Sequence, residues 1–455
     1  MSDFNLRPEL EASLARLNFT ELTDIQTQSL PVTLAGQDLI AQAKTGSGKT
    51  VTFGLSLLNT LDTQSQAVQA LVLCPTRELA EQVADEIRRL AVTIDNVKIL
   101  SICGGRPFKP QAASLNYGAH IIVGTPGRIE DHLSRETLSL NQLNTLVLDE
   151  ADRMLEMGFE KDVKAIVSHT PSHRQTLLFS ATFPDSIQSL ARHILDKPQH
   201  IQVESTHADE VIRQHFYQVV DEAERIDAVK RLLSAHQPTS AVVFCNTKKD
   251  VQTLAQQLQA FGVSVGALHG DLEQRDRDQM LIQFTQQSKI VLVATDVAAR
   301  GLDVDSVEMV INYHLAHDPE VHVHRIGRTG RAGKTGKAFS LFTPKQDYKM
   351  AQLSEYLGQR IQAESLPDKG VLEQAQLKAP MVSLVIDSGK KNKIRPGDLV
   401  GALTANPNIS GDDIGKIKVT AVRSYVAVKR ELGKTALDQL NQEKVKGRKL
   451  RARGL

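Results

Sequence analysis

The sequence predicts an α/β fold with two parallel-sheet domains in tandem, followed by a small α+β domain. Two observations predict the sheets: short apolar runs recur over residues 38–313, and helix-like segments separate them. Continuous runs of Val, Ile and Leu are typical of strands buried on both faces of a parallel sheet. The third observation is a change in the sequence pattern after about residue 375, where strands with alternating apolar residues and short helices are predicted.

The first sheet is predicted from the runs at residues 38–41, 70–74, 120–124, 145–149 and 176–180. Residues 202–211 are polar and without periodicity, so we interpret them as a linker. The second sheet is predicted from the runs at residues 241–245, 263–268, 290–294 and 308–313, with a helix over 250–261. We therefore expect one α/β domain over 1–206 and another over 207–372.

The last domain is predicted over residues 376–455. Val382, Leu384 and Ile386 alternate with other residues, as in a strand with one buried face. A helix over 395–406, strands over 416–422 and 423–430, and a helix over 435–443 follow. This β-α-β-β-α order, ending in a basic segment, predicts an RRM-like sandwich of about 80 residues.

Composition narrows the class of protein. The 455 residues allow roughly three domains, and 41% hydrophobic with 24% charged residues is ordinary for a globular chain. No apolar run approaches the length of a membrane span, and the first residues do not resemble a signal peptide, so we expect a cytoplasmic protein. Cys74, Cys103 and Cys245 are too few and too scattered for a disulfide framework, and we expect buried thiols.

The charge is divided unevenly along the chain. Lys and Arg number 54 and Asp and Glu 53, a net +1. Residues 376–455 hold 17 basic and 7 acidic residues, or +10, which leaves −9 for residues 1–375. A basic segment on an acidic body indicates a nucleic-acid partner for the last domain. The alternative is a cationic domain that is merely soluble.

A phosphate-binding loop follows the first predicted strand, where residues 43–50 read AKTGSGKT. Glycines let backbone N–H groups surround phosphate oxygens at a helix N-terminus. Lys49 is placed to reach the β and γ phosphates, and Thr50 to ligate Mg²⁺. Ala43 stands where the strict pattern has Gly, and a Gly-rich turn is the alternative. The candidate ATP ligands here are Ala43, Lys44, Thr45, Gly46, Ser47, Gly48, Lys49 and Thr50.

Two carboxylates end the predicted strand at 145–149. Asp149 is placed to hold the water shell of Mg²⁺, and Glu150 to orient or deprotonate an attacking water. The alternative is an acidic pair that caps a helix.

The second α/β domain has no phosphate loop of its own, so we expect a single ATP. Residues 324–331 read HRIGRTGR, and Arg328 and Arg331 suit a developing γ-phosphate charge. A surface turn is the alternative. Four nearby histidines lack the cysteines or the HExxH pattern of a metal site, so we do not expect one.

Taken together, the motifs resemble the DEAD-box family of ATP-dependent RNA helicases. In order, they read NFTELTDIQ, AKTGSGKT, PTRELA, GG, TPGR, DEAD, SAT, ATDVAARGLD and HRIGRTGR, over residues 1 to about 360. The resemblance implies two RecA-like domains that bind ATP, Mg²⁺ and RNA. The last domain is similar to that of family members that recognise large-subunit (23S) ribosomal RNA.

The resemblance assigns the nucleotide contacts. Phe19 would pack on adenine, and the amide of Gln26 would read the adenine edge. Asn18 and Leu22 depart from the family pattern, which has Gly and Pro there. Asp303 would contact the ATP ribose, His324 would bridge the two domains, and the SAT residues 180–182 would hydrogen-bond the DEAD carboxylates.

The resemblance also implies RNA contacts along the sugar-phosphate backbone of one strand, which carry no sequence information. The candidates in the helicase domains are Thr76, Arg77, Gly104, Gly105, Thr125, Pro126, Gly127, Arg128, Gln274, Arg277 and Thr295. Sequence choice must then lie in the last domain. Tyr425 is the single aromatic on its predicted central strands, so the sheet is a poor platform for stacking bases.

We therefore expect basic loops of the last domain to bind structured RNA. The candidates are Lys390, Lys391, Lys393, Arg395 and Arg448, with further cations near the C-terminus. A solvated tail is the alternative for the last ten residues.

The resulting hypothesis is an RNA-dependent ATPase and helicase that unwinds short duplexes locally. It predicts action on structured 23S ribosomal RNA in 50S ribosome assembly, as a monomer. The rival functions are an ATP-gated RNA clamp that does not unwind, and a DNA helicase of related architecture.

Overall fold

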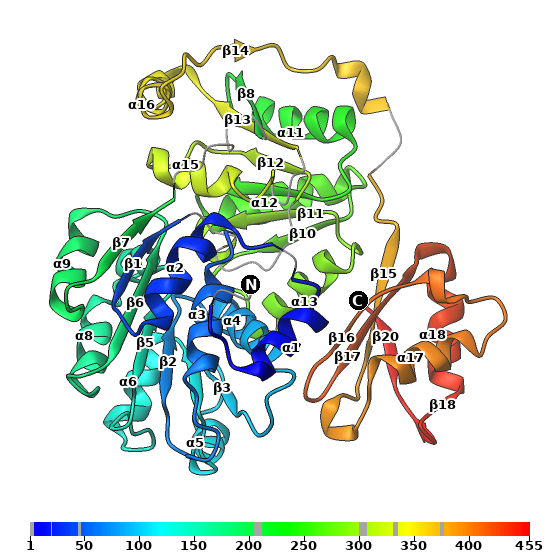
Figure 1. The fold of residues 1–455 in the computed structure, drawn as a ribbon. Coiled ribbons are helices and arrows are strands. Elements are labelled where there is room, and N and C mark those ends of the chain that lie inside the picture. Colours follow the sequence, from blue (N-terminus) through cyan, green and yellow to red (C-terminus); the bar gives the residue numbers. More distant parts are fainter. Residues whose placement is uncertain are drawn as a thin grey trace. The chain divides into compact units, whose positions relative to one another are not determined.

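A parallel sheet with helices on both faces forms the first domain (Figure 1). The structure is a computed structural model that describes residues 4–19, 21–43, 47–203, 212–299, 307–330, 335–373 and 377–455, and not the side chains at 297 and 299. Among these residues, the first sheet runs in the order β3 (Ile99–Ile102), β4 (Ile121–Gly124), β2 (Ala70–Leu73), β5 (Thr145–Leu148), β6 (Gln175–Ser180), β1 (Leu39–Gln42) and β7 (Gln199–Gln202).

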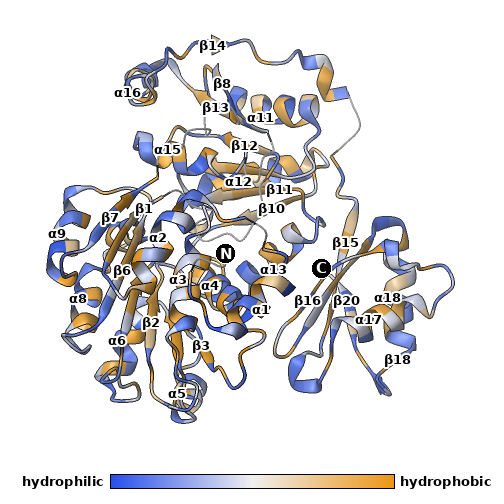
Figure 2. Cartoon of the chain, viewed as in Figure 1, coloured by the Kyte–Doolittle hydropathy of each residue, from blue (hydrophilic) through white to orange (hydrophobic). Residues whose placement is uncertain are grey.

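Helices cover both faces of this sheet. They are α1 (Pro8–Arg16), α2 (Asp24–Leu34), α3 (Lys49–Asn59), α4 (Arg77–Leu90), α5 (Phe108–Asn116), α6 (Pro126–Ser134), α7 (Ala151–Glu156), α8 (Glu160–Ser168) and α9 (Asp185–Ile194). Val72 packs into one apolar core and its neighbours Leu71 and Leu73 into another, on the opposite face. Because the strands are buried on both sides, their sequences are continuous apolar runs. In Figure 2 these strands are mostly orange, and the surrounding helices carry blue segments.

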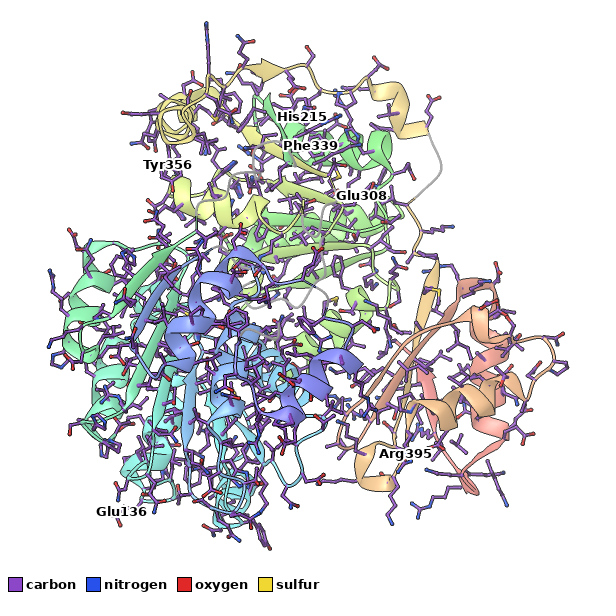
Figure 3. The ribbon with its side chains drawn as sticks, in the orientation of Figure 1. Glu136, His215, Glu308, Phe339, Tyr356 and Arg395 are labelled. Atoms are coloured by element: carbon purple, nitrogen blue, oxygen red, sulfur yellow. The ribbon has the colours of Figure 1, made fainter. Side chains whose placement is uncertain are left out.

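The second domain repeats this architecture. Among the described residues its parallel sheet runs in the order β10 (Val265–Leu268), β11 (Val291–Thr295), β9 (Ala241–Cys245), β12 (Met309–Asn312), β13 (Gly336–Phe342), β8 (Ile212–Gln218) and β14 (Ala363–Glu364). Its helices are α11 (Glu222–His236), α12 (Lys248–Ala260), α13 (Gln274–Thr285), α14 (Asp296–Ala299), α15 (Pro319–Ile326) and α16 (Asp347–Leu357). His215 of β8 stacks on Phe339 of β13, with ring centroids 5.2 Å apart (Figure 3).

The last domain has an antiparallel sheet in the order β16 (Ile414–Val419), β17 (Ser424–Lys429), β15 (Met381–Ile386) and β20 (Ala452–Gly454). Two helices, α17 (Pro396–Thr404) and α18 (Gly433–Gln442), pack on one face. A hairpin, β18 (Lys444–Val445) and β19 (Arg448–Lys449), follows α18. Short 3-10 turns span Pro344–Gln346, Lys369–Glu373, Lys390–Asn392, Gly411–Asp413 and Arg430–Leu432.

The structure confirms the predicted fold class. Every predicted apolar run is a strand, and the three cysteines are buried free thiols. For the last ten residues a solvated tail was the alternative prediction, and the structure shows a strand there instead. This strand, β20, pairs with β15, and Ile386 lies opposite Ala452. The predicted linker over 202–211 falls mostly outside the described residues. No helix among the described residues combines the length and the apolar character that crossing a bilayer requires.

The chain divides into two compact units, one with the first sheet and the other with the second sheet and the last domain. Within the latter, Leu377 and Ala379 pack into the core of the second helicase domain. Ser383 of β15 donates its hydroxyl to Oε1 of Gln286 at 2.6 Å, and Nε2 of Gln286 donates to the carbonyl of Lys416 at 2.9 Å. The face of this sheet opposite α17 and α18 therefore contacts the second helicase domain.

Candidate nucleotide and RNA site

The phosphate-binding loop connects β1 to α3. Gly48 lies just before α3 at φ 97°, a left-handed conformation that favours glycine, and a Cβ there would meet Nε2 of Gln26 at 2.4 Å. Lys49 is 6% exposed and its Nζ donates to the carbonyl of Ala43 at 2.9 Å. Thr50 follows in the first turn of α3. Lys44, Thr45 and Gly46 lie outside the described residues.

Helix α2 is held to this loop by Thr23 and Gln26 of the NFTELTDIQ motif. Oε1 of Gln26 accepts from the backbone N–H of Thr23 at 2.9 Å, and its Nε2 donates to the carbonyl of Gly48 at 3.2 Å. The hydroxyl of Thr23 donates to the carbonyl of Ser47 at 2.7 Å. Phe19 packs against the first core, with the guanidinium of Arg89 6.0 Å from its ring centroid. The Gln26 amide is thus positioned beside the phosphate loop.

Asp149 and Glu150 follow β5, at the same edge of the sheet. Asp149 is 3% exposed, and burial raises its pKa to about 6, with the neighbouring Glu150 adding to the rise and Lys49 opposing it. Glu150 has a left-handed backbone at φ 51° and its N–H donates to Oδ1 of Asp149 at 3.1 Å. Such a conformation is costly for a residue with a side chain, and it turns the chain sharply into α7.

The SAT residues contact the DEAD motif at Asp152. Oδ2 of Asp152 accepts from the backbone of Ala181 at 3.2 Å and from both the backbone and the hydroxyl of Thr182 at 3.0 Å. Its own N–H donates to the hydroxyl of Ser180 at 3.3 Å. The family resemblance predicted this contact without saying which DEAD carboxylate makes it. In the structure it is Asp152, four residues after the end of β5.

The candidate RNA residues of the first domain gather where β2, β3 and β4 end. Thr76 caps α4 by accepting from the N–H of Leu79 at 3.3 Å. Gly104 donates its N–H to the hydroxyl of Thr125 at 3.3 Å, which joins the GG and TPGR segments. A Cβ on Gly105 would meet Arg77 at 1.7 Å, so the guanidinium of Arg77 passes directly over this glycine.

The TPGR segment begins α6. Pro126 occupies the first turn of that helix, and a Cβ added to Gly127 would meet no atom of the described residues within 4 Å. The side chain of Arg128 is held in place by a hydrogen bond, because its Nη1 donates to the carbonyl of Arg106 at 2.9 Å. Glycines that permit close approach and arginine side chains therefore lie together at this edge, a combination that suits phosphate oxygens.

In the second domain, Thr295 ends β11, and Gln274 and Arg277 lie in the first turn of α13. His324 lies in the last turn of α15 and Arg328 follows that helix. Asp303 and Arg331 lie outside the described residues, and so does part of the ATDVAARGLD segment.

The last domain joins two basic segments that are distant in sequence. Lys390 and Lys391 form a short 3-10 turn, and Lys393 follows in a left-handed conformation at φ 60°. Lys446 of the β18–β19 hairpin donates Nζ to the carbonyl of Lys393 at 2.8 Å and pairs with Asp398 at 3.0 Å. We call these segments, residues 390–395 and 444–449, the basic surface; Arg395 is labelled in Figure 3 and Arg448 lies on β19.

Tyr425 is placed differently from the other candidates. Its residue is 5% exposed and lies on β17, opposite Val385 of β15 and Lys418 of β16. Its ring is on the face that contacts the second helicase domain, so little of it is available to a base.

Comparison with known proteins agrees with this arrangement. Residues 23–190 match the DEAD/DEAH box helicase family, residues 224–333 the helicase conserved C-terminal domain, and residues 383–453 the DbpA RNA binding domain. The chain is 50% identical to the ATP-dependent RNA helicase DbpA of Escherichia coli K12, covering 99% of this chain and 98% of that protein. The chain belongs to the DEAD-box family of ATP-dependent RNA helicases.

Other relatives place this helicase in the same group. It is 36% identical to the ATP-dependent RNA helicase DbpA of Bacillus subtilis 168, over 99% of this chain and 98% of that protein. Among solved structures, it resembles S. cerevisiae Dbp5 bound to RNA and ADP BeF3, with 30% identity and a TM-score of 0.73, covering 82% of this chain and 98% of that chain. The enzyme class expected from the motifs, an ATP-dependent RNA helicase, is thereby confirmed, with ATP as its nucleotide and RNA as its partner.

Proposed function

We propose that this helicase is directed by its last domain to structured 23S ribosomal RNA, and that it unwinds short duplexes there during 50S ribosome assembly. The observation that carries the proposal is the bond from Lys446 to the carbonyl of Lys393, which unites two basic segments into one surface on a domain of the DbpA type. The proposal places the protein in the cytoplasm as a monomer with domains over 1–206, 207–372 and 376–455.

The proposed ATP site lies in the first domain. Backbone N–H groups of the loop at Ser47 and Gly48, together with the ammonium of Lys49, would bind the triphosphate at the start of α3. Thr50 and Asp149 would hold Mg²⁺, and they fit it, because a hydroxyl and a buried carboxylate are oxygen ligands of the kind this cation takes. Bound Mg²⁺ would neutralise phosphate charge.

Glu150 is the proposed base. Its carboxylate would orient the attacking water and accept a proton as the water oxygen bonds to the γ-phosphorus and the bond to ADP breaks. Arg328 and Arg331 of the second domain would stabilise the charge on the transferring phosphoryl group, and His324 would help join the domains. Hydrolysis would therefore depend on closure of the two domains.

Closure would in turn depend on RNA. The residues gathered at the ends of β2, β3 and β4, with Thr295, Gln274 and Arg277, would bind one strand along its backbone. Bending that strand would separate it from its partner over a few base pairs, at a cost of about 1.4 kcal/mol per step. Two ligands binding the closed state together can supply such an energy.

The targeting proposal is tested with full-length protein and a panel of structured RNAs that includes 23S hairpins. Changing Lys390 and Lys391 to Gln should weaken binding of the preferred hairpin and lower the slope of log affinity against log salt by about 1 per lost phosphate contact. Lys434→Gln with Lys418→Gln, in the same domain outside the basic surface, is the charge-matched control. Equal effects of the two double variants would reject the assigned surface.

An ATP-gated clamp is the alternative function. A short duplex placed beside the preferred hairpin distinguishes the two, because a helicase releases a strand and a clamp binds without releasing one.

A DNA helicase is the other alternative. DNA of matched length should not stimulate ATP hydrolysis, and stimulation equal to that by RNA would favour a DNA helicase.

A further inference from the structure

One aromatic side chain of the first domain packs along the helix that begins with the TPGR segment. Phe108 begins α5, three residues after Gly105, and its ring stacks on His132 of α6, with centroids 4.1 Å apart and planes 14° apart. The guanidinium of Arg135 lies 4.6 Å from the Phe108 centroid, and that of Arg128 lies 6.0 Å from it. The ring therefore contacts α6 from its first turn to its end.

The spacing of the α6 residues explains why one ring can contact all of them. Residues 128, 132 and 135 are four and three apart, so they lie on one face of the helix. The carboxylate of Asp131 contacts both cations of this face: Nε of Arg135 donates to its Oδ1 at 2.7 Å, and Nε of Arg128 lies 3.6 Å from its Oδ2. We call Phe108 with Arg128, His132 and Arg135 the Phe108 stack.

His132 supplies a neutral surface for the ring. It is 0% exposed, and its Nδ1 lies 2.8 Å from the hydroxyl of Thr137, which donates to the carbonyl of His132 at 3.1 Å. Because that hydroxyl proton is already used, Nδ1 is the donor to Thr137. Burial lowers the pKa of His132, and the nearby Arg128 lowers it further. The imidazole is therefore uncharged at neutral pH, and it does not repel the two guanidiniums beside it.

The stack is one of three contacts between the GG segment and the TPGR helix. The N–H of Gly104 donates to the hydroxyl of Thr125 at 3.3 Å, and Nη1 of Arg128 donates to the carbonyl of Arg106 at 2.9 Å. These two hydrogen bonds lie near solvent, where water competes for the same groups. The third contact, the ring of Phe108, is apolar and aromatic, so water does not replace it.

We propose that Phe108 and His132 are positioning residues that hold the guanidinium of Arg128 in place for an RNA phosphate. The inference rests on the proposed RNA contact of Arg128 and adds the residues that prepare it. The side chain of Arg128 is 15% exposed. Fixing it before RNA arrives removes an ordering cost that binding would otherwise meet. Neither Phe108 nor His132 belongs to the motifs on which the family resemblance depends.

The test uses full-length Phe108→Leu, which keeps an apolar side chain but removes the planar ring. ATP hydrolysis is measured against the concentration of an RNA that carries the preferred hairpin and a single-stranded extension. The KM for RNA should rise by about three- to tenfold, while kcat at saturating RNA stays within about twofold, because only binding is weakened. An unchanged KM, or a fall in kcat without a rise in KM, would overturn the inference.

Phe108→Tyr tests whether the planar ring is the feature that matters. It keeps a ring that can stack on His132, so its KM for RNA should match that of the unchanged protein. An equal rise of KM in Phe108→Leu and Phe108→Tyr would overturn the inference, since the stack would then not be what positions Arg128.

Phe261→Leu is the matched control for the loss of a partly buried ring near a cation. Phe261 lies in the second domain, with Nζ of Lys230 5.4 Å from its ring centroid. It follows α12 and precedes β10, so it lies at the amino edge of that sheet, away from the candidate RNA residues. Its KM for RNA should be unchanged. A rise as large as that of Phe108→Leu would show a general effect of destabilisation and would overturn the inference.

Arg128→Gln separates this inference from the function beneath it. An unchanged KM for RNA in Arg128→Gln would overturn the proposed RNA contact itself. A raised KM in Arg128→Gln with an unchanged KM in Phe108→Leu would overturn the inference alone. In the double variant, Phe108→Leu should raise the KM by less than about twofold beyond Arg128→Gln, because Phe108 acts through Arg128. Two increases that simply multiplied would show that the residues act independently, and would overturn the inference.

Discussion

At the scale of single residues, the proposed chemistry depends on Glu150. Its left-handed backbone places the side chain at the turn between β5 and α7, beside the buried Asp149. Glu150→Gln keeps the size of the side chain but cannot accept a proton from water. We expect single-turnover hydrolysis with ATP and RNA to slow by about 10²-fold or more, while both ligands still bind. Hydrolysis at a near-normal rate would remove Glu150 from the role of base.

Asp149 leads to a prediction about pH. Burial raises its pKa to about 6, so below pH 6 the carboxyl is mostly protonated and must lose that proton to hold Mg²⁺. The affinity for MgATP should therefore have its maximal value above this pH, and it should fall by up to about tenfold per pH unit below it. Calorimetry from pH 5 to 8 measures this. Asp149→Asn, which cannot titrate, is the control, and an identical pH profile in both proteins would contradict the assignment.

Most candidate site residues could be proposed from the sequence, because they occur in short contiguous motifs at strand ends. The sequence did not reveal the contact of Gln26 with the phosphate loop, since these partners are distant in sequence. The contact between the SAT residues and the DEAD carboxylates was expected from the family resemblance, and the structure shows that Asp152 is the carboxylate that makes it. Nor did the sequence reveal that Tyr425 is buried, because Tyr425 lies on the face of the sheet that contacts another domain.

At the scale of elements, strands with a continuous apolar run or a clear alternation were predictable, and strands with neither pattern were not. β7 reads QHIQ and is largely exposed, and β8 reads IRQHFYQ, so neither forms a continuous apolar run. β20 was hidden in a basic segment that resembles a solvated tail. Pairing with β15 satisfies the backbone hydrogen-bonding groups of β20, and the side-chain pattern of this segment gives no sign of that pairing.

The turn that carries Lys390 depends on Gly389. A Cβ at this position would meet the carbonyl of Thr420 at 2.3 Å and the N–H of Arg423 at 2.6 Å, both of which are backbone atoms. Gly389→Ala should therefore destabilise the last domain by about 1–3 kcal/mol and displace the basic surface. Urea unfolding and hairpin binding measure the two effects. Gly411→Ala, which has open space around it among the described residues, is the control, and equal stability of both variants would contradict the packing described.

At the scale of the whole molecule, the second helicase domain includes residues that lie beyond its predicted end. Leu377 and Ala379 pack into its core, so a truncation after residue 375 removes part of that core. We expect it to be less stable, by about 2–3 kcal/mol, than a truncation after Pro380 that retains both side chains. Thermal unfolding compares the two proteins, and equal midpoints would show that these contacts contribute nothing.

The central claim is that the two helicase domains close only when ATP and RNA are bound together. Energy transfer between dyes on Tyr117→Cys and Val220→Cys tests it directly, because these positions are 77% and 79% exposed in the first and second domains. The native thiols are buried, and burial raises the pKa of each, to about 12 for Cys103, so they should label slowly. We expect a single large change in energy transfer, which appears only when both ligands are present. The same change with ATP alone, or no change with both, would contradict it.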